Sequence, residues 1–257
     1  MSGPERPRRA LVTGASRGIG QAIAHALSAS GHAVAGAART VADARTATDP
    51  RNGIVALPCD MADLAAVAAL PGRAAEALGG PVDVLVHAAG IARAARVTDI
   101  ALADWDEVFR VNVTSMLVLA QGCAPAMVAR GWGRIVTVGS LYSRMGAPFS
   151  GSYTASKHAL LGLTRVLAME LATKGVTANV VVPGWTDTEM VRAEARNVSR
   201  ANGYGEDEAV RRFLRGQPIG RMVEPAEVAA LVAFLCGDAA AAITGQALNI
   251  DGGSLQS

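Results

Sequence analysis

Tyr153 and Lys157 lie four residues apart in the segment SYTASKHALLGL, and their types and spacing could together perform acid–base chemistry. Residues four apart on a helix share one face, so the two side chains would point the same way. A phenol with an ordinary pKa near 10 is a poor acid–base group at neutral pH, and a neighbouring ammonium lowers that pKa. The same spacing also occurs on many helix surfaces, so the pair needs support from other residues.

Lysine is rare in this chain, and one of its two occurrences is at this position. Only Lys157 and Lys174 are lysines among the 24 Lys and Arg residues. An ammonium is a compact charge on a flexible stem that can approach a tyrosine and a ribose hydroxyl together, whereas a guanidinium is a broad planar fork. A lysine at this place in an arginine-rich chain therefore favours a functional role.

Short runs rich in Val, Ala and Leu alternate with longer stretches of helical pattern along the chain. Strands that are apolar on both faces and separated by helices predict a parallel sheet covered by helices on each side, an α/β fold. The expected strands are residues 10–14, 32–38, 53–58, 82–90, 134–140, 176–184 and 247–253.

No repeat, low-complexity tract or long linker divides the 257 residues, which predicts one domain spanning residues 1–257. Residues 189–217, after the sixth expected strand, are polar and helical in pattern, and the stretch ANGYGED interrupts them. We expect this segment to form a mobile lid over a medium-sized substrate.

Composition and charge argue against several classes of protein. The net charge is +2, and no basic cluster is large enough to favour nucleic acid. Three widely separated cysteines, Cys59, Cys123 and Cys236, argue against a disulfide framework or a metal site and favour buried thiols in a reducing compartment. There is no signal-peptide pattern and no uninterrupted apolar run of about 18 residues. We therefore expect a cytoplasmic protein that binds neither a membrane nor nucleic acid.

The segment TGASRGIG joins the first expected strand to the first helix, with Gly14, Gly18 and Gly20 spaced G-x-x-x-G-x-G. Glycine lets the backbone turn sharply and approach a pyrophosphate, and the helix N-terminus provides free N–H groups and the positive end of the helix dipole. In this position the motif predicts a dinucleotide site, and the alternative is a tight turn without a ligand.

The end of the second strand indicates which dinucleotide would bind. An acidic side chain there binds the ribose hydroxyls of NAD, whereas an arginine suits the extra phosphate of NADP. The strand ends near Arg39, and no carboxylate follows before Asp43. Arg39 and Arg17 could hold that phosphate, which favours NADPH over NADH, although both could instead be ordinary exposed arginines. Asp60, after the third strand, could contact the adenine edge or cap the next helix.

Two more polar residues could join Tyr153 and Lys157. Ser140 ends the fifth expected strand, at the carboxyl edge where open parallel sheets bind ligands. Asn112 lies in an otherwise apolar helix, where its alternative role is to bend the helix or to form a hydrogen-bonded core amide.

These motifs occur in an order that resembles the short-chain dehydrogenase/reductase family over essentially the whole chain. The resemblance implies a single Rossmann-like, doubly wound parallel sheet of about seven strands with helices on both faces, usually assembled as tetramers. The apolar circumference of the helices at 105–130 and 153–174 also favours a homotetramer. The motifs are TGASRGIG, HAAG, Asn112, Ser140, Tyr153-x-x-x-Lys157, PGWTDT and ITGQALNIDGG.

The resemblance implies a role for each of the four polar residues. Tyr153 would donate a proton to the carbonyl oxygen during reduction, and Ser140 would hydrogen-bond that oxygen. Lys157 would hold the nicotinamide ribose and lower the tyrosine pKa, and Asn112 would anchor a water that links Lys157 to solvent. The expected cofactor-binding residues are Gly14, Ser16, Arg17, Gly18, Ile19, Gly20, Arg39, Asp60, Met61, Ala89, Gly90, Tyr153, Lys157, Pro183, Gly184, Thr186 and Thr188.

One motif departs from the family pattern. The chain has His87 in HAAG, where the family usually has an asparagine after the fourth strand. That position generally supports hydrogen bonds at the centre of the sheet, and His87 lies outside the set of four polar residues, so we expect it to be structural.

The overall pattern is similar to bacterial 3-oxoacyl thioester reductases and aromatic polyketide ketoreductases. It implies NADPH-dependent reduction of a small-molecule ketone to a secondary alcohol. The alternatives are an NAD-dependent dehydrogenase that oxidises a hydroxy acid or a cyclic dihydrodiol, and a non-catalytic nucleotide-binding regulator. The complete set of four polar residues disfavours the regulator. Arg144, in SLYSRMGAPFSG, could meet an anionic substrate or lie on the surface.

Overall fold

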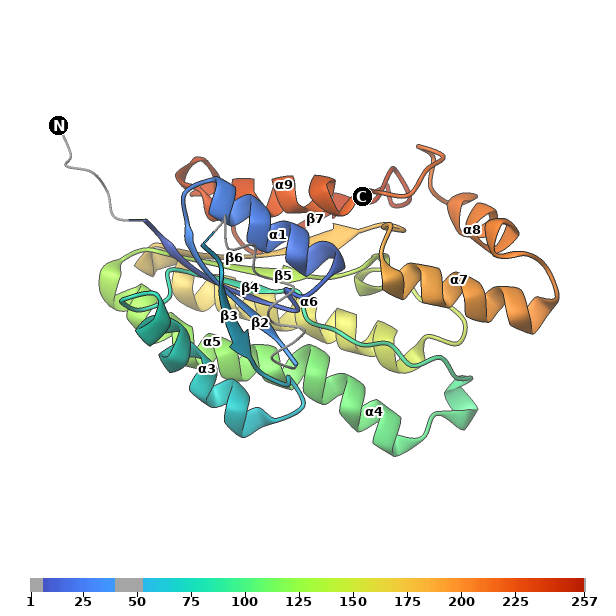
Figure 1. The fold of residues 1–257 in the computed structure, drawn as a ribbon, viewed down its shortest axis with the longest axis horizontal. Helices are drawn as coiled ribbons and strands as arrows, with labels where there is room; N and C mark the ends of the chain where they lie inside the picture. Colours follow the sequence, from blue (N-terminus) through green and yellow to red (C-terminus); the bar gives the residue numbers. More distant parts are fainter. Residues whose placement is uncertain (1–6, 40–52, 257) are drawn as a thin grey trace.

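The computed structural model describes residues 7–39 and 53–256, and Asp43 lies outside these ranges. Its centre is a parallel sheet in the order β3-β2-β1-β4-β5-β6-β7 (Figure 1). The predicted doubly wound α/β fold is confirmed, and the strand ends differ from the expected ones by up to three residues. The strands are β1 (Arg9–Thr13), β2 (Ala33–Ala38), β3 (Val55–Pro58), β4 (Val84–His87), β5 (Gly133–Val138), β6 (Val176–Pro183) and β7 (Ala247–Ile250).

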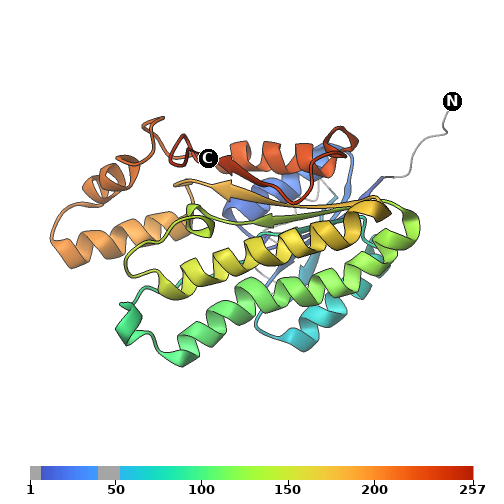
Figure 2. The ribbon, with the colours of Figure 1, turned by 180° about the vertical axis from the view of Figure 1, so that it is seen from behind.

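Helices cover both faces of the sheet (Figures 1 and 2). Successive residues of a central strand enter different apolar layers: Leu11 packs into one layer and Val12 into the other. This arrangement explains why the strands are apolar runs rather than alternating patterns. One face carries α1 (Gly18–Ala29) and α9 (Pro225–Cys236), and the other carries α3 (Leu64–Ala77), α5 (Ser115–Arg130) and α6 (Gly151–Leu171).

The helix before β5 is continuous from Leu102 to Arg130. It consists of α4 (Leu102–Phe109), a π-helical turn (Arg110–Thr114) and α5. By length and composition it is apolar enough to cross a membrane, with a mean hydropathy of 1.4, although no uninterrupted apolar run is that long. Met116, Leu119 and Met127 are fully buried in the layer beneath the sheet. These contacts are those of a core helix.

Two further helices follow β6 and extend beyond the carboxyl ends of the strands (Figure 1, orange). They are α7 (Glu189–Asn202) and α8 (Glu206–Leu214), and they occupy the stretch expected to form a lid. Gly203 ends α7 in the left-handed conformation, within the ANGYGED interruption.

The chain segments that lead into β5 and β6 approach each other closely, and a glycine lies at the point of approach in each. Gly175 lies between α6 and β6 with φ +75°, and a Cβ added there would lie 2.0 Å from the Gly131 carbonyl oxygen. Gly131, also left-handed, ends α5. The close approach aligns the start of β6 beside β5.

We predict that Gly175→Ala destabilises the protein by about 3–5 kcal/mol. The left-handed conformation costs an alanine about 1–2 kcal/mol, and the backbone clash adds a similar or larger overpacking cost. Gly79→Ala is a matched control, because Gly79 has φ +70° and open space at its Cβ position. In chemical denaturation, Gly79→Ala should lose only the free energy that the left-handed conformation costs an alanine, about 1–2 kcal/mol. Equal losses in the two variants would contradict this account.

Candidate active site

The glycine turn after β1 is packed so tightly that side chains cannot be added to it. A Cβ on Gly20 would lie 2.2 Å from the Gly14 carbonyl oxygen, and one on Gly14 would lie 2.8 Å from the Ala89 backbone. Gly18 has φ +56° and faces the Thr188 side chain. Arg17, the N-cap of α1, has no side-chain acceptor for the first N–H groups of the helix. This cradle fits the pyrophosphate of a dinucleotide.

The remaining expected contacts on this side of the sheet have different environments. Arg39 is exposed directly after β2, which suits a phosphate ligand. Asp60 is exposed after β3 and accepts a hydrogen bond from the Ala62 N–H at 2.9 Å. The cap of α3 is Asp63 instead, which accepts bonds from two backbone N–H groups of the first turn. The Met61 side chain is buried in the core.

The segment after β6 closes the other side of the cradle. Gly184 follows Pro183, and a Cβ on Gly184 would lie 2.5 Å from the Gln217 Oε1, so the protein's own packing requires glycine here. Thr186 is buried and donates to the Gly184 carbonyl at 3.0 Å. Thr188 caps α7 and lies against Gly18. The glycine turn and the start of α7 are therefore in contact.

The four polar residues expected to be catalytic come together at the carboxyl edge of the sheet. Tyr153 and Lys157 lie one turn apart on α6, with the lysine Nζ 5.5 Å from the tyrosine ring centroid. Ser140, two residues after the end of β5, interacts through its side chain with Tyr153. A Cβ on Gly90 would lie 3.5 Å from Asn112 Oδ1 and 3.6 Å from the Lys157 Nζ.

Asn112 is held in the π-helical turn, where the widened helix aims its side chain inward. Its amide accepts from the Ile91 N–H at 2.9 Å and donates to the Ile91 carbonyl and to Ser156 Oγ, each at 3.0 Å. Ser156 in turn donates to the Tyr153 carbonyl at 2.7 Å. Asn112 thus interrupts the regular helix and forms a bonded core amide that ties the chain after β4 to α6.

Burial dominates the electrostatics of the pair on α6. It lowers the pKa of Lys157 to about 8, and the Nζ donates to the Val138 carbonyl at 2.8 Å. Burial also raises the pKa of Tyr153 to about 12, against a lowering by Ser140, and nearby Tyr142 and Glu194 raise it further. The net shift of the Tyr153 pKa is therefore upward because the phenol is desolvated, and the lowering expected from Lys157 stays a prediction.

His87 bridges two elements beneath the site. It is fully buried, its Nδ1 lies 3.0 Å from Thr13 Oγ1, and its Nε2 lies 3.3 Å from the Asn112 carbonyl oxygen. Thr13 Oγ1 accepts from the Ala89 N–H, so its own proton can go to Nδ1, leaving Nε2–H to donate to Asn112. Burial lowers the pKa of His87 to about 3, with a further lowering by Lys157. These contacts are those of a neutral structural histidine.

Aromatic side chains line the route from Tyr153 to α8. Tyr142 makes edge contacts with Tyr153 and Trp185, at centroid distances of 6.1 and 6.5 Å, and Trp185 stacks on Phe213 at 4.2 Å. Buried Gln217 accepts from the Trp185 N–H at 2.8 Å and donates back to its carbonyl at 3.3 Å. Gln217, the last residue of the 189–217 segment, is therefore bonded to Trp185, which lies four residues before the segment begins.

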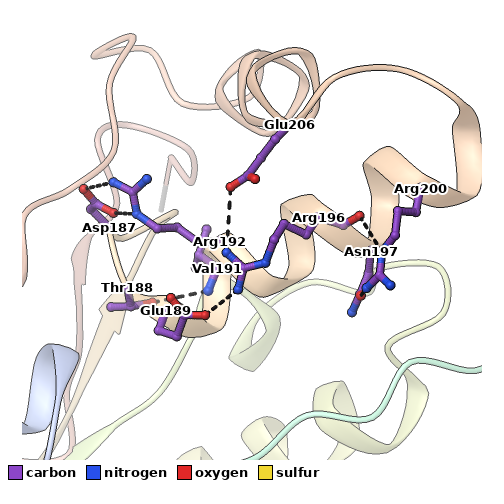
Figure 3. A network of polar contacts seen from close by, with 9 residues as sticks. All are labelled: Asp187, Thr188, Glu189, Val191, Arg192, Arg196, Asn197, Arg200 and Glu206. Atoms are coloured by element: carbon purple, nitrogen blue, oxygen red, sulfur yellow. Dashed lines mark hydrogen bonds and ion pairs between the residues drawn. The ribbon is translucent and has the colours of Figure 1, made fainter.

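The outer face of α7 carries an ion-pair network (Figure 3). Arg192 makes two 2.7 Å contacts with Asp187, and Arg196 pairs with Glu189 and, at 3.9 Å, with Glu206 on α8. Exposed pairs of this kind add little stability individually. Together they orient the side chains of α7 and α8 that face solvent.

Several residues that complete this site were not singled out from the sequence. The polar residues are held in place by hydrogen bonds to Ser156, Thr13 and the Val138 carbonyl. Of these, only Ser156 could have been found from the sequence, because it lies between Tyr153 and Lys157. Arg144 donates to the Ala247 carbonyl at 2.7 Å, so it anchors its loop to β7. Within the described ranges, no cluster of three His, Cys, Asp or Glu side chains could hold a metal ion.

We predict that His87 makes the fold sensitive to acid. Its folded pKa lies below the ordinary value near 6.5, so below pH 6.5 protonation favours the unfolded chain, and stability falls as pH drops toward 3. As pH falls, the free energy of unfolding of the wild type should decrease more steeply than that of His87→Asn, by about 1.4 kcal/mol per pH unit. Denaturant unfolding of both proteins between pH 4 and 7 measures the two slopes. His158→Asn, at an exposed position, should retain the wild-type slope; a His87→Asn slope equal to wild type would refute the prediction.

Comparisons with known proteins agree over nearly the whole chain. A family model described as "Enoyl-(Acyl carrier protein) reductase" matches residues 14–254. D-beta-hydroxybutyrate dehydrogenase of Rhizobium meliloti (strain 1021) is 34% identical over 96% of this chain and 98% of that protein. Acetoacetyl-CoA reductase of the same organism is 39% identical over 96% of this chain and 98% of its own length.

A solved structure agrees equally well. A variant of actinorhodin polyketide ketoreductase, solved with NADPH, superposes with a TM-score of 0.91 and 37% identity, covering 96% of this chain and 97% of that one. Together with the ordered motifs and the parallel sheet, these matches show that the chain is an oxidoreductase that acts on alcohol or carbonyl groups and belongs to the short-chain dehydrogenase/reductase family.

Proposed function

We propose that the protein reduces a ketone, as a 3-oxoacyl thioester or a polyketide-like carbonyl, to a secondary alcohol with NADPH. The observation that carries this proposal is the grouping of Tyr153, Ser140 and Lys157 at the carboxyl edge of the sheet, where Ser140 interacts with Tyr153 and the Lys157 Nζ lies 5.5 Å from the tyrosine ring centroid. At neutral pH Tyr153 carries its proton and can donate it to a carbonyl oxygen as general acid.

The residues of this chain have separate tasks in the proposed reaction. NADPH supplies the hydride. Ser140 hydrogen-bonds the carbonyl oxygen of the substrate and stabilises the negative charge that develops on it, and Tyr153 donates the proton to that oxygen. Lys157 contributes a nearby ammonium for the nicotinamide ribose, and Asn112 fixes the backbone from Ile91 to α6 that holds both side chains.

The choice of NADPH is supported by Arg39 and Arg17. Arg39 is exposed directly after β2, and the sequence has no carboxylate between it and Asp43. Arg17 lies in the glycine turn. An arginine fork binds a phosphate through paired charge-assisted hydrogen bonds. The related ketoreductase structure was solved with NADPH.

We also propose that residues 1–257 form one catalytic domain in which 189–217 acts as the lid. The bonds of Gln217 to Trp185 hold the last residue of the segment beside the chain that leads into it, so α7 and α8 can move as a unit. Three buried free cysteines support a reducing, cytoplasmic setting.

The test is nicotinamide absorbance during turnover of a 3-oxoacyl thioester and of a bicyclic ketone. We expect turnover with NADPH to exceed that with NADH, and Tyr153→Phe to lower kcat by about 10²–10⁴-fold because the general acid is lost. Tyr204→Phe is the matched control, since Tyr204 lies between α7 and α8 under Arg212, away from Ser140, and should turn over like wild type.

Full activity in Tyr153→Phe would rule out the proposed mechanism. The second candidate is an NAD-dependent dehydrogenase of a hydroxy acid, which the similarity to D-beta-hydroxybutyrate dehydrogenase favours. Turnover only with NAD and an alcohol would support that candidate. Nucleotide binding without turnover of any substrate would support the remaining alternative, a non-catalytic nucleotide-binding regulator.

We propose a homotetramer, supported by apolar side chains exposed on the helices of one face. Met169 is 82% exposed and Val166 53% exposed on α6, and Leu117 is 39% exposed on α5. Light scattering coupled to gel filtration should give four times the chain mass at micromolar concentration. Met169→Glu should lower that mass, because a charge would be buried in the contact. A wild-type monomer would disprove the assembly.

A further inference from the structure

Three aromatic side chains continue from Tyr153 toward α8, and they come from three separate segments of the chain. Tyr142 comes after β5, Trp185 comes after β6, and Phe213 lies near the end of α8. The Tyr142 ring lies 6.1 Å from that of Tyr153 and 6.5 Å from that of Trp185, with interplanar angles of 83° and 90°. Tyr142 and Trp185 form what we call the aromatic wall. Both residues are half-buried, so part of each stays accessible beside the candidate general acid.

Trp185 is held in place by contacts to its main chain and to its ring. Buried Gln217 accepts from the Trp185 N–H at 2.8 Å and donates to its carbonyl at 3.3 Å. The Val223 N–H donates to the same carbonyl at 2.8 Å. Phe213 stacks on the indole with ring centroids 4.2 Å apart and an interplanar angle of 8°. A side chain fixed in this way loses little conformational entropy when a ligand packs against it, so the aromatic wall is preorganised.

The position of the aromatic wall decides which part of a substrate it contacts. In the proposed reaction the substrate carbonyl lies against Tyr153 and Ser140. A group that extends from this carbonyl toward α8 passes Tyr142 first and then Trp185. Aromatic rings have a negative face and a positive edge, so a pair of rings gains energy beyond the area that it buries. A saturated group of the same size gains only the burial of its surface.

We propose that Trp185 is a specificity-determining residue, and that the aromatic wall selects ketones with an aromatic ring close to the reacting carbonyl. Saturated cyclic ketones and linear acyl chains of similar size bind less tightly, because they lack the ring face and edge that the wall complements. The inference rests on the proposed reductase function and narrows its substrate to a ketone that carries an aromatic ring.

The test uses 2-tetralone and 2-decalone, two neutral bicyclic ketones with the same arrangement of carbon atoms. Only 2-tetralone has an aromatic ring, and that ring is not conjugated with the carbonyl group. With NADPH, wild type should show a kcat/KM for 2-tetralone at least about fivefold above that for 2-decalone. Trp185→Leu should reduce this ratio to between about one and two, because leucine keeps apolar bulk but has no aromatic ring.

Two further variants separate the aromatic ring of Trp185 from its packing. Trp185→Phe keeps a ring at this position and should retain most of the wild-type ratio. Trp132→Leu is the control, since Trp132 directly precedes β5, at the opposite end of that strand from Ser140, and should leave the ratio unchanged. Loss of selectivity in both leucine variants, or a ratio for Trp185→Phe as low as that for Trp185→Leu, would overturn the proposal.

A binding experiment separates this inference from the reductase function. Calorimetric titration of the protein loaded with NADP⁺, or with NAD⁺ if only NAD⁺ binds, measures selectivity without turnover. Tighter binding of 2-tetralone in wild type, lost in Trp185→Leu and kept in Trp185→Phe, would support the inference even if neither ketone is reduced and the proposed function fails. Equal affinities in wild type, a preference for 2-decalone, or binding of neither ketone would contradict it whatever the kinetics show.

Discussion

The candidate site depends on a chain of buried hydrogen bonds across the carboxyl ends of β1 and β4. The Ala89 N–H donates to Thr13, Thr13 lies beside His87, and His87 reaches the Asn112 carbonyl. The Asn112 side chain then bonds Ile91 and Ser156, which bonds the backbone of Tyr153. Because unpaired polar groups are costly in a dry core, every member constrains its neighbour.

The same burial sets the protonation of the reacting groups. Desolvation lowers the pKa of Lys157 and raises that of Tyr153, so both shift toward their neutral forms. Neutral His87 fits this environment, since a second cation beside Lys157 would add repulsion.

Packing and function are combined in several glycines and in the 189–217 segment. Gly14 and Gly20 are required by the approach of the protein's own backbone, and the same absence of side chains forms the cradle for a dinucleotide. Gly184 is required by Gln217. The α7 helix that follows has ion pairs on its exposed face, and Ala195 on another face is fully buried. One face of this helix is therefore exposed to solvent, and the other packs against the protein.

The sequence by itself determined the fold class, the strands and the four polar residues, because periodicity and ordered spacings are local properties. It also indicated a structural role for His87, and it offered a helix-bending or hydrogen-bonded core amide as the alternative role of Asn112. Only the tertiary structure decided the partners: that Lys157 bonds the Val138 carbonyl, that Asp63 rather than Asp60 caps α3, and that burial raises the Tyr153 pKa. Desolvation and hydrogen-bond partners depend on residues distant in sequence that the fold brings together, and spacing along the chain does not contain them.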